Sequence, residues 1–187
     1  MNIEELLLIL KQQLKGNYIM GIDGRCGSGK TTLAALIKEE LDVNVVHIDH
    51  FYLPFNERKE NWKELLAGNM NFERLLNEVI VPYREKKIFT PNGYNAHNDE
   101  YFTLSEVDPE KPLIIEGSYS SYFDLYDYQI FMTCNEQTQE ERLQKREGMN
   151  FVNFKNIWIK KEEDFFKYYS SADKADLILD TSEEDND

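Results

Sequence analysis

The stretch GRCGSGKT, at residues 24–31, constrains the fold of this chain more than any other part of it. It follows a short apolar run at 18–23 and precedes an amphipathic pattern at 31–41, so the order is strand, glycine-rich loop and helix. Glycines let the backbone curl so that its N–H groups point at phosphate oxygens, and the following helix presents its positive end to the same anion. The pattern therefore predicts a phosphate-binding loop formed by Gly24, Arg25, Cys26, Gly27, Ser28, Gly29, Lys30, Thr31 and Thr32.

Three side chains of this loop have predicted roles. Lys30 is placed to reach the β- and γ-phosphates as a point charge, and the Thr31 hydroxyl is placed to bind Mg²⁺. Cys26 lies beside backbone donors and Lys30, which predicts a lowered thiol pKa and loss of nucleotide binding on alkylation. A plain glycine-rich turn with a chance lysine is disfavoured, because the whole pattern and both flanking elements match.

The rest of the chain fits an α/β fold. Short apolar runs lie at 43–49, 113–116, 129–133 and 176–180, and helical patterns lie at 2–15, 72–85 and 138–147. Short apolar strands that alternate with helices are typical of a parallel sheet buried on both faces. We expect a three-layer P-loop NTPase fold with about five parallel strands, and a polar loop at 90–98.

Composition narrows the class of protein. A length of 187 residues without an internal repeat or linker predicts a single domain over 1–187, with a frayed acidic end at 183–187. The net charge of −14 disfavours nucleic-acid binding, and the apolar run Leu6 to Leu10 is too short to span a membrane. Two distant cysteines, Cys26 and Cys134, and the lack of a visible export signal predict reduced thiols in a cytoplasmic protein.

Two carboxylates end predicted strands. Glu116 ends the run LIIE and Asp49 follows the run VNVVHI. Either one, taken alone, is compatible with capping the next turn. Beside a phosphate loop, they predict one group that orients Mg²⁺ and one that takes a proton from an attacking hydroxyl. The predicted metal-binding residues are Thr31, Asp49 and Glu116.

Four motifs together resemble the uridine kinase group of P-loop kinases, near phosphoribulokinase and bacterial pantothenate kinase. They are GRCGSGKTTLA, HIDHFYLP, LIIEGSYS and RLQKREG, and the resemblance covers residues 18–180. It implies ATP and Mg²⁺ as cofactors and phosphorylation of a hydroxyl on a small molecule, foremost a nucleoside such as uridine or cytidine. It also implies an acceptor-site insertion at about 52–108 and a lid at about 140–160.

The resemblance assigns roles residue by residue. Asp49 matches the catalytic aspartate, Tyr52 matches a tyrosine that holds the acceptor, and Glu116 matches a glutamate that binds Mg²⁺ directly or through water. Arg142 and Arg146 match lid arginines that close over the transferring phosphate, where such charges stabilise the transition state. The implied catalytic residues are Asp49, Lys30, Arg142 and Arg146.

The acceptor side departs from the family pattern. Phe72, Glu73 and Arg74 resemble the stretch that lines the acceptor pocket, with Asn71 and Glu73 in place of a clear DWD. Tyr94 and Asn95 resemble a PxYD loop, in which the Asn95 amide can hydrogen-bond a sugar hydroxyl. The implied substrate-binding residues are Tyr52, Glu73, Tyr94, Asn95 and His97, with His50 as a further candidate and His47 as a core histidine.

Other functions stay open from the sequence. One is a kinase for pantothenate or a sugar phosphate, and another is a nucleotide-binding regulator with a degenerate acceptor site. A GTPase switch is disfavoured, because DKAD at 173–176 departs from NKxD. The expected partner is a small-molecule acceptor, with no nucleic acid or membrane, and with a homo-oligomer left open. The basic residues expected to converge on one pocket are Arg25, Lys30, Arg142, Lys145 and Arg146, and the aromatics of 151–169 are expected to pack the core and the lid.

Overall fold

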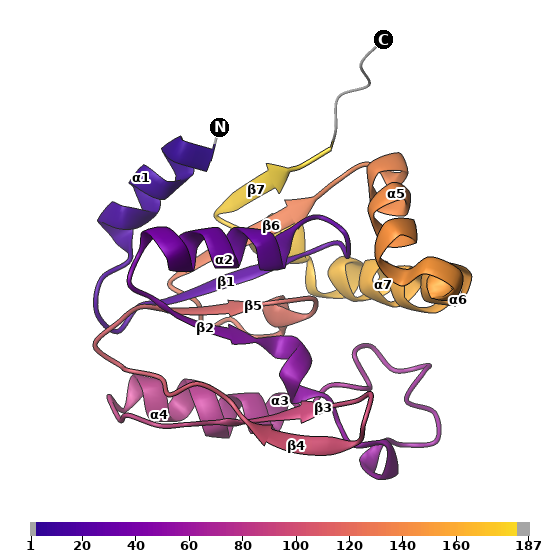
Figure 1. The fold of residues 1–187 in the computed structure, drawn as a ribbon, viewed down its shortest axis with the longest axis horizontal. Helices are drawn as coiled ribbons and strands as arrows, with labels where there is room; N and C mark the ends of the chain where they lie inside the picture. Colours follow the sequence, from indigo (N-terminus) through magenta and orange to yellow (C-terminus); the bar gives the residue numbers. More distant parts are fainter. Residues whose placement is uncertain (1–2, 183–187) are drawn as a thin grey trace.

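Five parallel strands form the central sheet in the computed structural model, which describes residues 3–182. The strand order is β2-β5-β1-β6-β7, so the strand before the phosphate loop lies in the middle (Figure 1). This confirms the predicted α/β class, and the predicted acidic end at 183–187 lies outside the described residues. The bounds are β1 Ile19–Gly24, β2 Asn44–His47, β5 Leu113–Glu116, β6 Tyr128–Thr133 and β7 Leu177–Asp180.

Helices cover both faces of the sheet. On one face, α1 (Ile3–Gln13) and α2 (Lys30–Glu40) bury Leu10 and Ile37 against Met20 and Ile130 of the strands. On the other face, the helical segment that follows β2 and the long helix that precedes β7 form a second core. The apolar positions repeat at helical spacing toward the sheet, which is why the sequence pattern located these helices.

The helix expected at 72–85 is a continuous helical segment with a wider turn in its middle. It consists of α3 (Phe72–Leu75), a π-helical turn (Leu76–Ile80) and α4 (Val81–Arg84). Asn71 caps its start, because its side chain accepts a hydrogen bond from the backbone N–H of Arg74 at 3.0 Å. The wider turn lies just before Pro82, which has no N–H to give to an α-helical bond.

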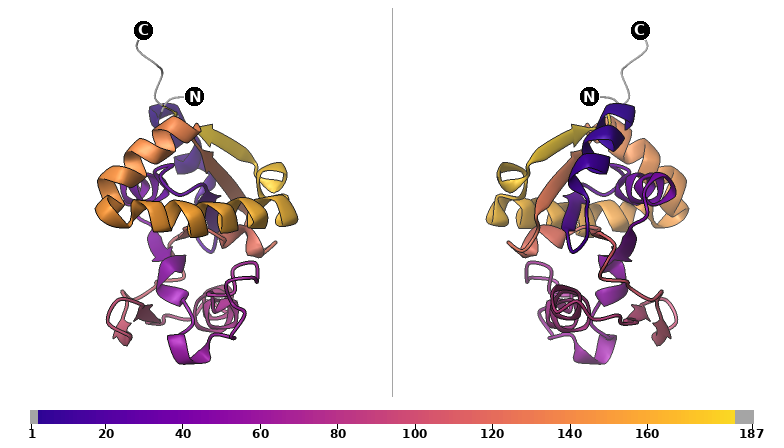
Figure 2. Two further views of the ribbon diagram at one scale, coloured as in Figure 1. Left: turned by 90° about the vertical axis from the view of Figure 1, so that its right-hand side faces the viewer. Right: turned by 90° about the vertical axis from the view of Figure 1, so that its left-hand side faces the viewer.

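The segment expected as a polar loop at 90–98 is instead part of a hairpin. Strands β3 (Asn92–Asn95) and β4 (Glu100–Thr103) pair antiparallel, and Figure 2 shows them with α3 and α4 below the sheet. Gly93 allows this pairing, since a Cβ there would meet the Phe102 ring at 2.6 Å. The prediction was wrong because a strand reading NGYN has no alternating apolar pattern.

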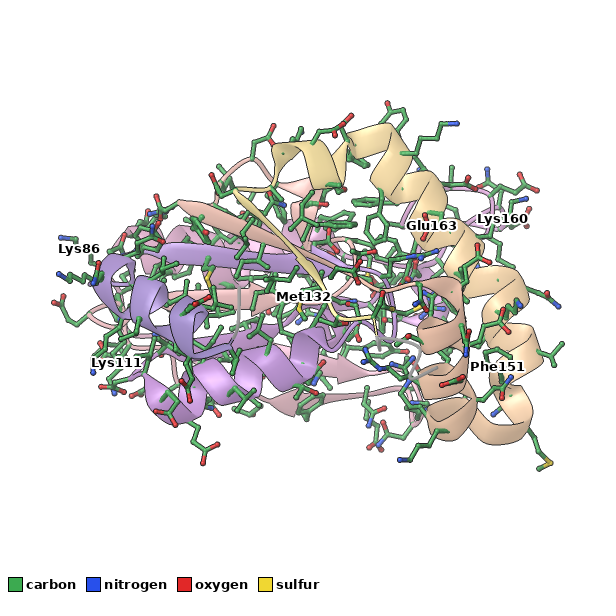
Figure 3. The ribbon with its side chains drawn as sticks, turned by 90° about the horizontal axis from the view of Figure 1, so that it is seen from above. Lys86, Lys111, Met132, Phe151, Lys160 and Glu163 are labelled. Atoms are coloured by element: carbon green, nitrogen blue, oxygen red, sulfur yellow. The ribbon has the colours of Figure 1, made fainter. Side chains whose placement is uncertain are left out.

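A run of helices connects β6 to β7 at one end of the molecule. In Figure 3, Phe151, Lys160 and Glu163 mark that end, while Lys86 and Lys111 lie at the opposite end. Phe165 and Phe166 pack into the core against Tyr119 and Phe131, as expected for part of the aromatic cluster. Within residues 3–182, every helix is too short or too polar to cross a membrane. The helices are α5 Glu136–Glu147, α6 Phe151–Phe154, a π-helical turn Lys155–Ile159, α7 Lys160–Tyr169 and α8 Ser171–Lys174.

Candidate active site

The glycine-rich loop connects β1 to α2 as predicted from its flanking patterns. Gly24 has a φ of 135°, and a Cβ there would lie 1.9 Å from the Met132 carbonyl oxygen, so no other residue fits. Gly29, with a φ of 92°, precedes the first turn of α2. The Lys30 ammonium arches back over the loop and donates to the carbonyls of Gly24 at 2.6 Å and Arg25 at 3.0 Å. These two hydrogen bonds from Lys30 therefore hold the loop backbone in its curled conformation.

A buried carboxylate, Asp23, supports this loop and was not singled out from the sequence. Its Oδ1 accepts hydrogen bonds from the backbone N–H groups of Gly24 at 2.7 Å and Tyr119 at 3.1 Å, and Oδ2 accepts one from Ser121 at 2.8 Å. Burial raises the pKa of Asp23 to about 6, although these bonds and the Lys30 charge act in the opposite direction. Asp23 thus fastens the phosphate loop to the chain after β5. The signal was present, because an acidic residue inside the apolar run MGIDG needs buried partners.

Glu116 lies beside Thr31, and these are two of the three residues expected to bind metal. The Thr31 hydroxyl lies 3.3 Å from Oε1 and 3.4 Å from Oε2 of this buried carboxylate. His47 Nδ1 also contacts Glu116 Oε1, and this hydrogen bond raises the pKa of His47 against the effect of its burial. His47 was expected in the core; its side chain is instead half-exposed, because the end of β2 faces the site.

Asp49 and Tyr52 form a hydrogen-bonded pair after β2. A 3₁₀ turn, Ile48–Phe51, ends the strand two residues earlier than expected and turns Asp49 toward the cavity. The Tyr52 hydroxyl donates to Asp49 Oδ1 at 2.7 Å. Burial and the Asp49 charge raise the pKa of Tyr52, so the phenol stays a donor. The pair fixes the orientation of the carboxylate and leaves Oδ2 for another donor.

The basic residues expected in one pocket divide into two groups. Lys30, Arg142 and Arg146 line the cavity, whereas Arg25 and Lys145 do not. The Arg142 guanidinium donates to the Gly27 carbonyl at 3.1 Å and to the Thr181 carbonyl at 2.9 Å, so it joins the phosphate loop to the end of β7. Arg146 lies over the Phe154 ring, with 5.2 Å between the guanidinium carbon and the ring centroid.

Arg25 and Lys145 are held or directed elsewhere. Arg25 donates to Glu163 at 2.6 Å and to the Cys134 carbonyl at 2.8 Å, which turns its guanidinium toward α7. Lys145 is exposed on α5. The expectation of five converging cations is therefore wrong for these two, because neighbours on α7 and the helix face set their directions.

Cys26 is buried, and the pKa of its thiol is raised, whereas the sequence predicted a lowered pKa. Burial and the nearby Glu162 carboxylate raise the pKa of the Cys26 thiol, and these effects outweigh Lys30 and Arg146. The Gln139 amide lies 3.4 Å from its sulfur. The predicted lowering of this pKa is therefore wrong: loop position suggests an activated thiol, but folding surrounds it with protein and an acid.

The expected acceptor residues are only partly gathered at the cavity. Tyr52 and His97 line it, whereas Glu73, Tyr94 and Asn95 do not. Glu73 is exposed on α3, the buried Tyr94 hydroxyl donates to Asp99, and Asn95 Oδ1 accepts from the His97 N–H at 2.9 Å.

His50, the further histidine candidate, also lies outside the cavity lining. Its ring centroid is 5.4 Å from that of His47 and 5.1 Å from that of Phe102. Burial lowers the pKa of His50, so the ring packs as a neutral group against the hairpin.

A single cavity of about 1360 Å³ joins the phosphate loop, Asp49 and Glu116. Pockets for one small ligand measure roughly 300–1,000 Å³, so this cavity has room for two ligands side by side. Five further residues line the cavity beyond Asp49: Phe55, Arg58, Trp62, Asn69 and Trp158. The sequence did not single out the first four for the site, and it placed Trp158 with the aromatics that pack the core and the lid.

Comparison with known proteins agrees with this geometry. The model of the KAP family P-loop domain matches residues 2–174. The chain belongs to this family of P-loop domains. Its fold is also that of a solved structure named a possible uridine kinase from Bacillus stearothermophilus, with a TM-score of 0.70, 21% identity, and coverage of 95% of this chain and 97% of that one.

Two curated relatives extend the comparison. A uridine kinase of Clostridium botulinum (strain 657 / Type Ba4) is 30% identical over 56% of this chain and 54% of the relative. A nicotinamide riboside kinase of Eremothecium gossypii is 28% identical over 72% of this chain and 66% of the relative. The chain matches about half the length of the uridine kinases, and the resemblance to uridine kinase-like P-loop kinases is confirmed.

The donor set in this P-loop domain fits magnesium. The Thr31 hydroxyl and the carboxylates of Glu116 and Asp49 are all hard oxygen ligands, which Mg²⁺ prefers. Within residues 3–182, the structure contains no cluster of three His, Cys, Asp or Glu side chains that forms a metal site by itself. A magnesium ion here would therefore take part of its coordination from phosphate oxygens and water, as is usual for nucleotide sites.

Proposed function

We propose that this protein is an ATP-dependent kinase that uses Mg²⁺ and phosphorylates a hydroxyl group of a small nucleoside, with uridine and cytidine as the first candidates. One observation carries the proposal: the phosphate loop and the Asp49–Tyr52 pair line the same cavity. The relatives named uridine kinase and nicotinamide riboside kinase support a nucleoside-like acceptor. We place the acceptor in the segment at about 52–108 and the closing lid at about 140–160.

Asp49 acts as the general base in this proposal. Tyr52 holds Oδ1 at 2.7 Å, so Oδ2 faces the acceptor and takes the proton of its hydroxyl. The acceptor oxygen then forms a bond to the γ-phosphorus, the bond from that phosphorus to the β–γ bridging oxygen breaks, and ADP leaves. The Asp49 proton passes to solvent when the product departs.

The remaining residues stabilise charge on the phosphates. Lys30 exchanges its two loop carbonyls for phosphate oxygens, and Arg142 and Arg146 approach from the lid side. Thr31, Glu116 and Asp49 would hold Mg²⁺, which neutralises charge between the β- and γ-phosphates when it is bound. Cavity walls that exclude water strengthen all of these interactions.

Several contacts bear on the two alternatives of a GTPase switch and a regulator with a degenerate acceptor site. Asp176 Oδ2 accepts from the Gln129 N–H at 2.7 Å and Lys174 pairs with Asp124 at 3.0 Å, so two residues of DKAD have structural partners away from the cavity. This supports a kinase over a guanine-reading switch. Asn71 caps a helix and Asn95 caps a turn, so neither substitution removes a cavity group.

The test is release of ADP from Mg-ATP in the presence of single acceptors from a panel of nucleosides, pantothenate and sugar phosphates. We expect ADP to appear in equal amount to a phosphorylated nucleoside detected by mass spectrometry. Turnover that ignores the acceptor, or no turnover with any of them, contradicts the proposal. The Asp49→Asn variant serves as the control for a contaminating kinase.

A further inference from the structure

Tyr119 lines the cavity shortly after the end of β5, and its backbone has a conformation that tyrosine rarely adopts. Its φ is 78° and its ψ is 5°, in the left-handed region, where the Cβ of a bulky residue is strained. Glycine adopts this conformation without that cost, so the turn by itself does not require a tyrosine. A strained residue in a cavity wall indicates that its side chain has a role there.

The surrounding chain holds Tyr119 in this position. Its backbone N–H donates to Asp23 Oδ1 at 3.1 Å, and its carbonyl accepts from the Tyr122 N–H at 3.1 Å. Its ring packs against the edge of Phe165 on α7, with 4.8 Å between the ring centroids and an angle of 68° between the rings. The direction of the ring is therefore set before any ligand enters.

The Tyr119 hydroxyl is buried without a hydrogen-bond partner. The residue is 3% exposed, and no group among residues 3–182 pairs with its Oη atom. An unpaired polar group in the interior costs free energy on folding, so buried hydroxyls are nearly always bonded. The buried Tyr83 hydroxyl follows that rule, because it donates to the Lys111 carbonyl at 2.8 Å. Tyr119 thus carries a donor that the folded chain does not use.

The charges around the hydroxyl define what it can do. Burial raises the pKa of Tyr119, and the carboxylates of Glu162, Asp23 and Asp49 raise it further, so the phenol keeps its proton at neutral pH. Glu162 is bonded to the phosphate loop at the Cys26 N–H, and Asp49 is the proposed base. Both of these carboxylates line the cavity. Groups from the phosphate side and from the acceptor side of the cavity therefore act on the same hydroxyl.

A neutral donor suits this place better than a cation. A lysine or arginine here would pair with Asp49 or Glu162, and its charge would lower the basicity of Asp49. A phenol that is bonded to neither carboxylate stays free to donate to an entering oxygen. The phosphoryl group in transit has such oxygens, since its charge is spread over its non-bridging atoms. Because the hydroxyl is shielded from water, a hydrogen bond formed there is strong.

We propose that Tyr119 is a further catalytic residue, whose hydroxyl donates a hydrogen bond to a non-bridging oxygen of the phosphoryl group as it passes from the nucleotide to the acceptor. The inference rests on the proposed function, because it adds a donor to that reaction. The proton stays on Tyr119 throughout, and no covalent bond to its Oη forms or breaks.

The first test compares stability with turnover in Tyr119→Phe, which removes the hydroxyl and retains the ring against Phe165. Since the hydroxyl is unpaired in the folded chain, its removal should leave Tm equal to or above that of the parent protein. We expect kcat to fall by about tenfold or more and the KM of the acceptor to stay within about twofold. Thermal unfolding and steady-state kinetics measure the two effects.

Tyr83→Phe is the matched control and should behave in the opposite way. Tyr83 is also buried, but its hydroxyl is bonded and the residue lies outside the cavity lining. We expect its Tm to fall by about 2–4 °C and its turnover to stay within about twofold of the parent protein. The two substitutions remove the same atom, so any difference between them reports where that atom lies.

The second test measures binding without turnover. Isothermal titration calorimetry compares Mg-ADP alone with Mg-ADP in the presence of aluminium fluoride, which imitates the phosphoryl group in transit. Tyr119→Phe should bind Mg-ADP within about twofold of the parent protein and should bind the aluminium fluoride complex about tenfold or more weakly. Tyr83→Phe should match the parent protein with both ligands.

Three results overturn the inference: turnover of Tyr119→Phe within twofold of the parent protein, unchanged binding of the aluminium fluoride complex, or a lowered Tm or loss of folding. The last result would show that the hydroxyl is bonded in the folded protein. The outcome is separable from that of the kinase proposal. Weakened aluminium fluoride binding in a protein that forms no ADP with any acceptor sustains the Tyr119 contact and contradicts the kinase. Acceptor-dependent turnover that is the same in Tyr119→Phe sustains the kinase and removes Tyr119 from its mechanism.

Discussion

The carboxylate of Glu162, on α7, accepts a hydrogen bond from the backbone N–H of Cys26 in the phosphate loop, with 2.9 Å between Oε2 and the nitrogen. The other oxygen, Oε1, accepts from the Ser118 hydroxyl at the end of β5. Glu162 is 6% exposed and lines the cavity. One buried carboxylate therefore joins α7 to the loop expected to hold phosphate.

Loss of this carboxylate should destabilise the fold. Glu162→Ala leaves a buried N–H and a hydroxyl without an acceptor, so we expect the free energy of unfolding to fall by about 1–3 kcal/mol. Urea denaturation followed by fluorescence measures it. Glu163→Ala is the matched control: Glu163 pairs with Arg25 at the surface and should cost less than about 1 kcal/mol. Equal losses for the two variants would refute a special role for Glu162.

The Cys26 thiol should react slowly in the folded protein. Burial and Glu162 raise its pKa, so the reactive thiolate is scarce at neutral pH. In a Cys134→Ser background, we expect iodoacetamide to label Cys26 at least about tenfold more slowly than it labels the same chain in urea. Glu162→Gln removes a charge that raises this pKa and should speed labelling. Fast labelling of the folded parent protein would show that the thiol is activated after all.

Replacement of the proposed base should separate binding from turnover. Asp49→Asn keeps the size of the side chain and removes its basicity, so we expect Mg-ATP affinity to change little and turnover to fall by ~10² or more. Lys30→Ala should weaken both, because Lys30 is placed to contact the phosphates directly. Nucleotide titration and single-turnover kinetics measure the two effects. Full turnover by Asp49→Asn would remove Asp49 from the mechanism.

Asp23 should make stability depend on pH in a defined direction. Its pKa in the folded protein is about 6, above the ordinary value of 3.8, so the folded state holds a proton that the unfolded state has released. The stabilisation is complete below the lower value and is lost as pH rises through the upper one. From about pH 5 to about pH 7.5, we expect the parent protein to lose about 1–2 kcal/mol more than Asp23→Asn, which has no charge to bury. Parallel loss in both proteins would contradict the raised pKa.

Much of the fold was predictable because its signals are local. The phosphate loop, both of its flanking elements and the five strands appear as short stretches with characteristic spacing, and Glu116 was correctly placed at the end of its strand. The β3–β4 hairpin was not predictable in this way, since its turn around Asp99 and the packing of Phe102 over Gly93 replace any apolar alternation.

The candidate site likewise contains features that local sequence determines and features that depend on tertiary packing. The sequence by itself determined the loop that curls around Lys30, the helix that follows it, and a carboxylate at the end of β5 with a second one shortly after β2, because backbone geometry and strand direction act over neighbouring residues. The tertiary structure decided which side chains complete the cavity. Glu162 contacts Cys26 across 136 positions of sequence. The Trp62 ring contacts the Trp158 ring, although no sequence pattern in either segment predicts this contact. Such pairings depend on how α7 packs against the chain after β2, and only the folded chain brings those surfaces within contact distance.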